Sequence, residues 1–233
     1  PYTTLFRSVQ AMEEILDMGI SVAGGCCGTT PGHIRRLNRL RAGRRQKLPQ
    51  EKQSTVITSY AAAVEIGDDP VIIGERINPT GKSKFKQALR DHDLEFILRE
   101  GISQQERGAH VLDVNVGLPE IDEPSMMAEV IRELQGITEL PLQIDTSNTE
   151  AMARAMRVYN GKPLLNSVNG KQEVMDAVFP LVKRYGAVVV ALTLDESGIP
   201  ETADGRIAIA EKIYREAAKY GIGKKDILID ALC

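Results

Sequence analysis

Carboxylate and amide side chains recur in this chain where short apolar runs end. Each run is rich in β-branched or aliphatic residues, as buried strands are. A buried carboxylate accepts hydrogen bonds from ring N–H and exocyclic amine groups, whereas an Asn amide both donates and accepts. The pattern therefore predicts a site that reads a flat ring with amide and amine edges. Its candidate residues are Glu75, Arg76, Asn78, Asp113, Asn115, Asp145, Asn166 and Asp230.

For any one of these residues, a simpler interpretation is that it caps the following helix, as Asn148 or Thr149 would do. Five strand ends in succession favour a shared site instead. The polar loop 75–82 is open to two further interpretations, an ordinary connecting loop or a phosphate site. It has the glycine spacing of neither a P-loop nor a dinucleotide-binding fold.

The elements that must position these residues alternate along the chain from Val56 onward. Strand-like runs followed by amphipathic stretches are typical of βαβ units and a parallel sheet. The fold class we expect is α/β, of the (β/α)8 TIM-barrel type, in which the carboxyl ends of the strands share one mouth. The expected strands are 71–75, 111–116, 142–146, 164–168, 187–193 and 227–230, and the expected helices 84–107, 122–135, 149–158, 171–184 and 204–220.

Six strands and five helices make up three-quarters of such a barrel, so we expect an incomplete one with two exposed sheet edges. The region before it, residues 1–41, also looks like the last piece of something larger. Residues 42–70 are expected to be a linker, and residues 71–233 the truncated barrel. The basic run 35–47 is interpreted as a solvated helix end and tether rather than an RNA-binding segment.

Within the first region, residues 8–18 predict the end of an amphipathic helix and residues 20–23 a short buried strand. Thr30 is the expected N-cap of a second helix that begins at Pro31. That helix is expected to point its apolar side chains inward, namely Ile34, Leu37 and Leu40. A single helix–strand–helix unit is too small to bury a core of its own.

Cys26 and Cys27, flanked by glycines, form a second candidate site in this region. Thiolates suit zinc, and neighbouring glycines permit the bend that adjacent cysteines need in order to converge. Two sulfurs do not complete a zinc site, which takes three or four ligands. His33 is a further candidate, although a surface histidine is the favoured interpretation, and Cys233 belongs to the other region. The residues alone leave the presence of zinc open.

Composition narrows the class of protein. Of 233 residues, 42% are hydrophobic and 26% charged, which is ordinary for a soluble globular protein. No apolar run approaches the roughly 20 residues that span a bilayer, and no signal peptide opens the chain. A net charge of −3 argues against a nucleic-acid partner. Three cysteines do not fit a secreted disulfide framework, so we expect a cytoplasmic protein that does not bind membranes.

Five motifs together resemble a known family. Residues 24–29 resemble the closing zinc motif of homocysteine S-methyltransferase barrels. The segments 74–81, 113–115, 144–147 and 166–170 resemble the pterin-binding barrel of cobalamin-dependent methionine synthases. The order of homocysteine barrel, linker and folate barrel is also that of the family. The resemblance covers roughly residues 10–233, and the set of motifs is more specific than any one of them.

The resemblance implies methyl transfer from 5-methyltetrahydrofolate through cobalamin to homocysteine, which gives methionine. It implies that the pterin is bound by Glu75, Asn78, Asp113, Asn115, Asp145, Asn166 and Asp230, with Asn166 and Asp145 as the catalytic residues. Cys26 and Cys27 would be two of three zinc thiolates, and residues 1–41 the end of the homocysteine-binding barrel. Cobalamin would be bound by a module absent from this sequence, so we expect the chain alone to be inactive or weak.

Two alternatives remain. One is another pterin-dependent barrel enzyme, such as a dihydropteroate synthase or a corrinoid protein methyltransferase; residues 20–48 argue against it because those enzymes lack the Cys-Cys unit. The other is a non-catalytic α/β binding module, which leaves the polar strand ends unexplained.

Overall fold

The computed structural model describes residues 2–45 and 52–232. It divides into two compact units, Pro1–Lys52 and Gln53–Cys233. Within the described ranges, no helix has the length and apolar character needed to cross a membrane.

The first unit consists of two helices, α1 (Tyr2–Asp17) and α2 (Pro31–Leu40), joined by an irregular loop. As predicted, Thr30 is the N-cap of α2 and Pro31 opens the helix. The strand expected at 20–23 is wrong, because this segment is irregular in the structure. A strand needs a partner for its backbone groups, and residues 2–45 contain no other extended strand to supply one.

Apolar side chains of the first unit remain accessible. In α2, Leu37 and Leu40 are half-buried, while Ile34 is 45% exposed, so the expected inward packing is only partial. Val22 in the loop is 89% exposed. No side chain of α2 is therefore fully buried.

The second unit is built on a parallel sheet of six strands in the order β3-β4-β5-β6-β7-β8. The strands are β3 (Ile73–Ile77), β4 (Val111–Val114), β5 (Leu142–Asp145), β6 (Leu164–Asn169), β7 (Val188–Leu192) and β8 (Ile227–Asp230). All six lie within two residues of their expected positions, so the predicted α/β class is confirmed. The sheet ends at β3 and β8, where Ile73 and Ile229 are 37% and 38% exposed.

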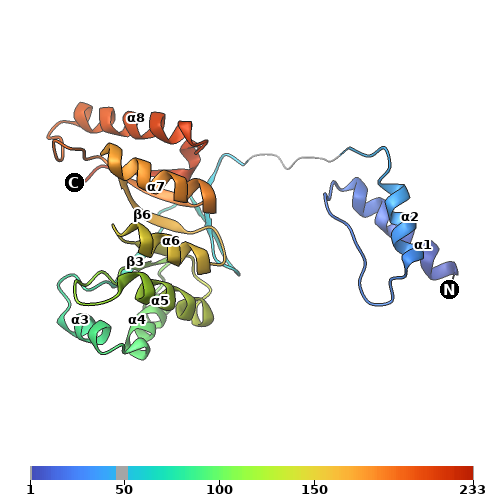
Figure 1. Cartoon of the computed structure of the whole chain (residues 1–233), viewed down its shortest axis with the longest axis horizontal. Helices are drawn as coiled ribbons and strands as arrows, with labels where there is room; N and C mark the ends of the chain where they lie inside the picture. Colours follow the sequence, from blue (N-terminus) through green and yellow to red (C-terminus); the bar gives the residue numbers. More distant parts are fainter. Residues whose placement is uncertain (1, 46–51, 233) are drawn as a thin grey trace. The chain divides into compact units, whose positions relative to one another are not determined.

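Helices connect successive strands, and α5 to α8 lie in chain order along one face of the sheet (Figure 1). The helices are α3 (Ser83–Arg90), α4 (Leu94–Glu106), α5 (Glu123–Ile137), α6 (Thr149–Val158), α7 (Gln172–Tyr185) and α8 (Ala203–Lys219), followed by the short 3-10 helix η1 (Lys224–Asp226). The single helix expected at 84–107 is wrong, because α3 and α4 are separate. Asp93 accepts a hydrogen bond from the backbone N–H of Phe96 (3.0 Å) and thereby starts a new helix.

The two faces of the sheet bury different residues, because side chains alternate along a strand. Leu112 and Val114 of β4 pack with the helices in the main core. Val111, on the opposite face, packs with Leu164 and Val188 in a smaller inner cluster. Side chains two residues further along the strands therefore continue this inner face toward the carboxyl ends.

A hairpin of β1 (Thr55–Thr58) and β2 (Ala63–Ile66) closes the inner cluster. Ile57 is fully buried against that cluster. The backbone N–H of Thr58 donates to the carbonyl of Lys162 (2.9 Å), just before β6 begins. The linker expected over 42–70 is therefore corrected: 55–66 are a folded part of the second unit, and 46–51 lie outside the described residues.

Candidate functional site

Four side chains on β5 and on β4 with the residue that follows it form a reciprocal set, which we call the acid–amide ladder. Asp113 and Gln143 are paired across the two strands, and Gln143 Nε2 donates a hydrogen bond to Asp113 Oδ1. Two residues further along, Asn115 Nδ2 donates to Asp145 Oδ2 (2.9 Å). Each strand thus supplies one acid and one amide, and each acid is held by the amide of the other strand.

The spacing of the ladder follows from strand geometry. Side chains two residues apart point to the same face, so Asp-x-Asn on β4 and Gln-x-Asp on β5 place all four groups on the inner face. Asn115 is oriented in turn, since its Oδ1 accepts from the backbone N–H of Gly117 (2.9 Å), which turns Nδ2 toward Asp145. The predicted contact residue Asn115 therefore has both ends of its amide engaged within the protein.

The ladder brings two carboxyl groups into a poorly solvated place. Asp113 is only 2% exposed, and burial, assisted by the charge of Asp145, raises its pKa to about 7. The hydrogen bond from Gln143 opposes that rise. Burial also raises the pKa of Asp145, against the hydrogen bond from Asn115. Asp113 can therefore hold or release a proton near neutral pH.

The loop after β3 supplies further charges. Glu75 raises the pKa of both ladder acids by charge repulsion, so its carboxylate acts on the same place. Lys82 lowers the pKa of Asp113, and its Nζ donates to the backbone carbonyl of Glu75 (2.7 Å). Arg76 is exposed, and its backbone N–H is bound by Gln104 Oε1 (2.8 Å).

The other predicted residues lie near the carboxyl ends of their strands with weaker links to the ladder. Asn78 is 5% exposed, and its Oδ1 accepts from the N–H of Thr80 (2.8 Å), which shapes its own loop. Asn166 on β6 is half-buried and is paired in register with Asp145. Asp230 ends β8, is exposed, and accepts from the N–H of Leu232 (2.8 Å).

Two residues of this site escaped the sequence analysis. Gln143 precedes Asp145 by two residues, and that same-face spacing is the signal that would have identified it. Thr146 is 4% exposed and donates its hydroxyl to Glu123, which in turn raises the pKa of Asp145. No spacing rule predicts the contact between Thr146 and Glu123, because Glu123 belongs to α5 and is distant in sequence.

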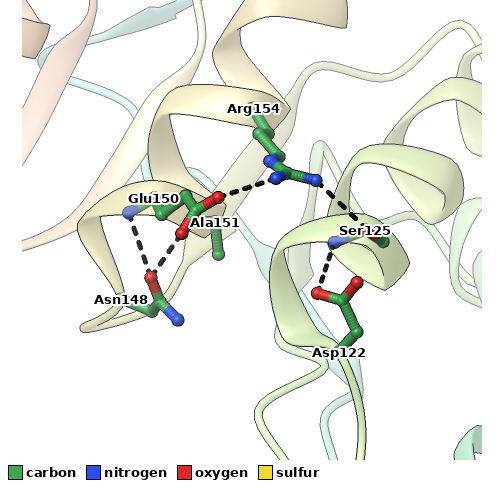
Figure 2. A network of polar contacts seen from close by, with 6 residues as sticks. All are labelled: Asp122, Ser125, Asn148, Glu150, Ala151 and Arg154. Atoms are coloured by element: carbon green, nitrogen blue, oxygen red, sulfur yellow. Dashed lines mark hydrogen bonds and ion pairs between the residues drawn. The ribbon is translucent and has the colours of Figure 1, made fainter.

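The helices that follow β4 and β5 are fixed to each other at their N-termini (Figure 2). Asn148 caps α6, as predicted, by accepting from the N–H groups of Glu150 (3.0 Å) and Ala151 (3.2 Å). Arg154 donates to Glu150 (2.7 Å) and across to the hydroxyl of Ser125 on α5 (3.2 Å). A cavity of about 560 Å³ lies beside these N-termini, lined by Gly117, Leu118, Pro119, Ile121, Asp122, Glu123, Pro124 and Asn148.

The cysteine loop of the first unit is less constrained. Cys26 and Cys27 are exposed free thiols. His33, the third candidate ligand, has its Nδ1 engaged by the backbone N–H of Thr30 (3.2 Å). In the described part of the chain, no three His, Cys, Asp or Glu side chains are grouped so that they could hold a metal. These residues therefore do not make up a zinc site by themselves; Cys233 lies outside the described residues.

Comparison with known proteins agrees with this division into a barrel and a shorter first unit. A family model described as pterin binding enzyme matches residues 74–233. The chain belongs to the pterin-binding enzyme family. A second model, described as homocysteine S-methyltransferase, matches residues 4–40 of this pterin-binding chain.

Its curated relatives include two methionine synthases. That of Mycobacterium tuberculosis is 32% identical over 226 residues, which are 94% of this chain and 19% of the relative. That of Mycobacterium leprae is 30% identical over 233 residues, again 94% of this chain and 19% of the relative. The pterin-binding chain thus spans about a fifth of the length of the curated relatives it matches.

Among solved structures, dihydropteroate synthases share the fold. The Xanthomonas albilineans enzyme in complex with 7,8-dihydropteroate has a TM-score of 0.56 and 25% identity, over 70% of this chain and 60% of that one. The Vibrio fischeri enzyme has a TM-score of 0.54 and 18% identity, over 75% of this chain and 65% of that one. These matches support the TIM-barrel type that the alternating pattern predicts for the second unit.

Proposed function

We propose that the mouth of the sheet binds the pterin ring of 5-methyltetrahydrofolate, as part of an enzyme that transfers its methyl group through cobalamin to homocysteine to give methionine. The observation that carries the proposal is the acid–amide ladder, a pair of positioned carboxyl groups on strands of a pterin-binding family member. The likeness to methionine synthases over 94% of the chain supports the choice of reaction.

The chemistry of the ladder suits such a ring. Ionised carboxylates are acceptors only, so Asp113 and Asp145 match a ligand edge that presents N–H and amine donors. Because charge-assisted hydrogen bonds are stronger than neutral ones, two fixed acids also orient the ring. Glu75, Asn78, Asn115 and Asp230 complete the proposed binding set, with Asn115 acting through Asp145.

The reacting nitrogen sets a second requirement. A tertiary amine is a poor leaving group, so the nitrogen that loses the methyl group must gain a proton or a strong hydrogen bond as the bond to carbon breaks. We assign this task to Asn166, which can donate from its amide, with the adjacent Asp145 as its charged neighbour in register.

Zinc and cobalamin belong to the proposed reaction of the whole enzyme. Cys26 and Cys27 would supply two thiolate ligands to a zinc ion that holds homocysteine as thiolate; the remaining ligands must come from beyond the described residues. Cobalamin would carry the methyl group between the two substrates and would be bound by a separate module. We assign residues 1–41 to the homocysteine half and place the enzyme in the cytoplasm.

Dihydropteroate synthesis is the second candidate, because a dihydropteroate synthase in complex with 7,8-dihydropteroate shares the fold. It accounts for the barrel but leaves the match of residues 4–40 to homocysteine S-methyltransferases without a role. A comparison of 5-methyltetrahydrofolate with 7,8-dihydropteroate as ligands of this chain separates the two.

The proposal is tested by ligand-detected NMR and calorimetry on the chain with 5-methyltetrahydrofolate. We expect weak one-to-one binding that falls by roughly tenfold or more in Asp145→Asn, since a charge-assisted hydrogen bond contributes about 1.5–3 kcal/mol. The matched control is Asp69→Asn, which makes the same charge change at an exposed loop residue before β3.

Absence of binding by the unmodified chain at millimolar ligand, or equal binding by Asp145→Asn, would overturn the assignment of the mouth. Tight stoichiometric binding would leave the site assigned but refute the expectation that six strands provide only an incomplete pterin site.

A further inference from the structure

We propose that Gln143 is a positioning residue of the pterin site, which orients the Asp113 carboxyl group and selects the ionised form that meets the ligand. The inference deepens the proposed function and rests on it for the identity of the ligand. Its structural basis is the pair Asp113 and Gln143, which we call the inner rung of the acid–amide ladder; Asn115 and Asp145 form the outer rung. The hydrogen bond of the inner rung is present without any ligand.

The inner rung is the more deeply buried of the two. Asp113 is 2% exposed and Gln143 is 6% exposed, whereas Asn115 and Asp145 of the outer rung are half-buried. Apolar side chains adjoin the inner rung: Val111 precedes Asp113 on the same face of β4, and Leu164 lies beside Gln143 as its register partner on β6. Asp113 therefore borders the apolar inner cluster.

Gln143 holds one side of that carboxyl group. Within residues 52–232 it is the only group hydrogen-bonded to the Asp113 carboxyl, through Oδ1. An amide N–H donates more strongly to a carboxylate than to the carbonyl oxygen of a protonated carboxyl, so the bond favours the ionised form. It leaves Oδ2 available for a donor from the mouth.

The charges around Asp113 make this bond decisive. Asp145 on β5 and Glu75 on β3 both disfavour ionisation, and burial acts in the same direction. Lys82, from the loop after β3, and Gln143 favour ionisation. Because the pKa of Asp113 is about 7, its ionised and protonated forms are similarly populated at neutral pH. Loss of the hydrogen bond from Gln143 would therefore make the protonated form predominate.

The matching ligand class is a heterocycle that donates N–H groups, such as the pyrimidinone edge of a pterin. Ionised Asp113 accepts from such an edge, whereas protonated Asp113 loses half of its acceptor character and presents an O–H instead. Gln143 would thus set the pH range over which the mouth binds its ligand, without touching the ligand itself.

The test compares Gln143→Met with Gln87→Met in the ligand-free chain. Gln87 is the matched control because its Nε2 also donates to a carboxylate, that of Asp91 (2.9 Å), on the exposed face of α3. Carboxyl carbon NMR follows the titration of Asp113, assigned by its disappearance in Asp113→Asn. We expect a midpoint near pH 7 in the unmodified chain, unchanged in Gln87→Met.

In Gln143→Met the midpoint should move upward by about one pH unit, the size expected for one lost charge-assisted hydrogen bond. Gln143→Glu is the second variant if the first does not fold. It keeps the shape of the side chain but replaces the donor by an acid, and it should move the Asp113 titration upward as well. An unmoved midpoint in either folded variant overturns the inference.

Measurement of folate binding as a function of pH separates this inference from the proposed function. The affinity for 5-methyltetrahydrofolate should rise as pH increases through 7, and in Gln143→Met the same rise should lie at higher pH. If the unmodified chain binds no folate at any pH, the proposed function fails while the carboxyl titration still decides the role of Gln143. If folate binds and both proteins share one pH profile, the inference fails alone.

Discussion

The acid–amide ladder and the Cys26–Cys27 loop are both short motifs, yet the surrounding protein fixes only the first. Each ladder acid receives a hydrogen bond from the neighbouring strand, and both strands are backed by a helical layer. The two thiols are exposed on a loop, and the hydrogen bonds at this loop, such as that from the Cys26 N–H to Thr29 Oγ1 (3.0 Å), are local.

The difference shows what converts a motif into a site. On paired strands, a two-residue spacing determines which side chains meet, because register and alternation are fixed by the backbone. In a glycine-rich loop, adjacency in sequence leaves the direction of each side chain open. Preorganisation therefore comes from the sheet and is absent where a motif has no paired strand beside it.

The largest expected contrast concerns zinc. A structural zinc site binds with about 10–16 kcal/mol, and two thiolates without further ligands supply only part of its coordination. We expect the chain to bind zinc at least roughly a thousandfold more weakly than a complete site, and Cys26→Ser to abolish even that binding. Competition with a chromogenic chelator measures the affinity. Retention of one zinc per chain against a nanomolar chelator would show that the loop is a complete site after all.

Burial provides the next contrast, between Ile57 and Ile34. Ile57 is fully buried where the β1–β2 hairpin meets the inner cluster, whereas Ile34 in α2 is 45% exposed. We expect Ile57→Ala to lower the free energy of unfolding of the second unit by about 3 kcal/mol. Ile34→Ala should change the free energy of unfolding of the first unit by about 0.5 kcal/mol or less. Urea denaturation measures both. Equal effects would mean that the hairpin contributes no more to the free energy of unfolding than an exposed segment does.

The hairpin is also where sequence reasoning failed. The six parallel strands were predictable because each is flanked by turn residues and followed by a helical pattern. Thr55–Thr58 and Ala63–Ile66 are four-residue strands joined by a short turn and adjacent to a charged run, so composition favoured a linker. Only contacts distant in sequence, such as that between Thr58 and Lys162, assign them to the barrel.

The site itself was predictable in part. Asp113, Asn115 and Asp145 stand out as polar residues in apolar strands, and the structure joins them. Asp230 was predicted by the same rule and ends the edge strand β8; its membership of the site stays a prediction. The rule identifies the end of a strand but carries no information on how far apart two strands lie in the sheet. The pKa of Asp113 was not predictable, because it depends on burial and on charges from three segments.

The raised pKa of Asp113 should make stability depend on pH in the direction opposite to that of an acid whose pKa is lowered in the folded state. The pKa of Asp113 is raised from 3.8 to about 7 in the folded chain, so the folded state binds more protons than the unfolded state between these values. The free energy of unfolding should therefore fall as pH rises from about 4 to about 7, by up to ~3 kcal/mol from this group.

Asp113→Asn removes the charge while keeping an acceptor for Gln143, so it should abolish most of this fall. Urea denaturation at pH 5 and pH 8 measures the difference, with Asp69→Asn as the control for an exposed acid. An equal loss of stability in Asp113→Asn and the unmodified chain would show that the inner rung is not where the proton is held.

The smallest contrast compares two helix caps that look alike in the sequence. Asn148 accepts hydrogen bonds from the N–H groups of Glu150 and Ala151 at the start of α6, in the network that joins α6 to α5 (Figure 2). Thr30 is the N-cap of α2, where its hydroxyl lies against His33 Nδ1 (2.8 Å) at an exposed position. We expect Asn148→Ala to destabilise the second unit by about 1 kcal/mol, and Thr30→Ala to change the helicity of α2 little. Backbone chemical shifts and denaturation measure the two effects. Because both residues satisfy the same sequence rule, an equal loss at Thr30 would show that the rule, rather than the local hydrogen bonds, determines the strength of the cap.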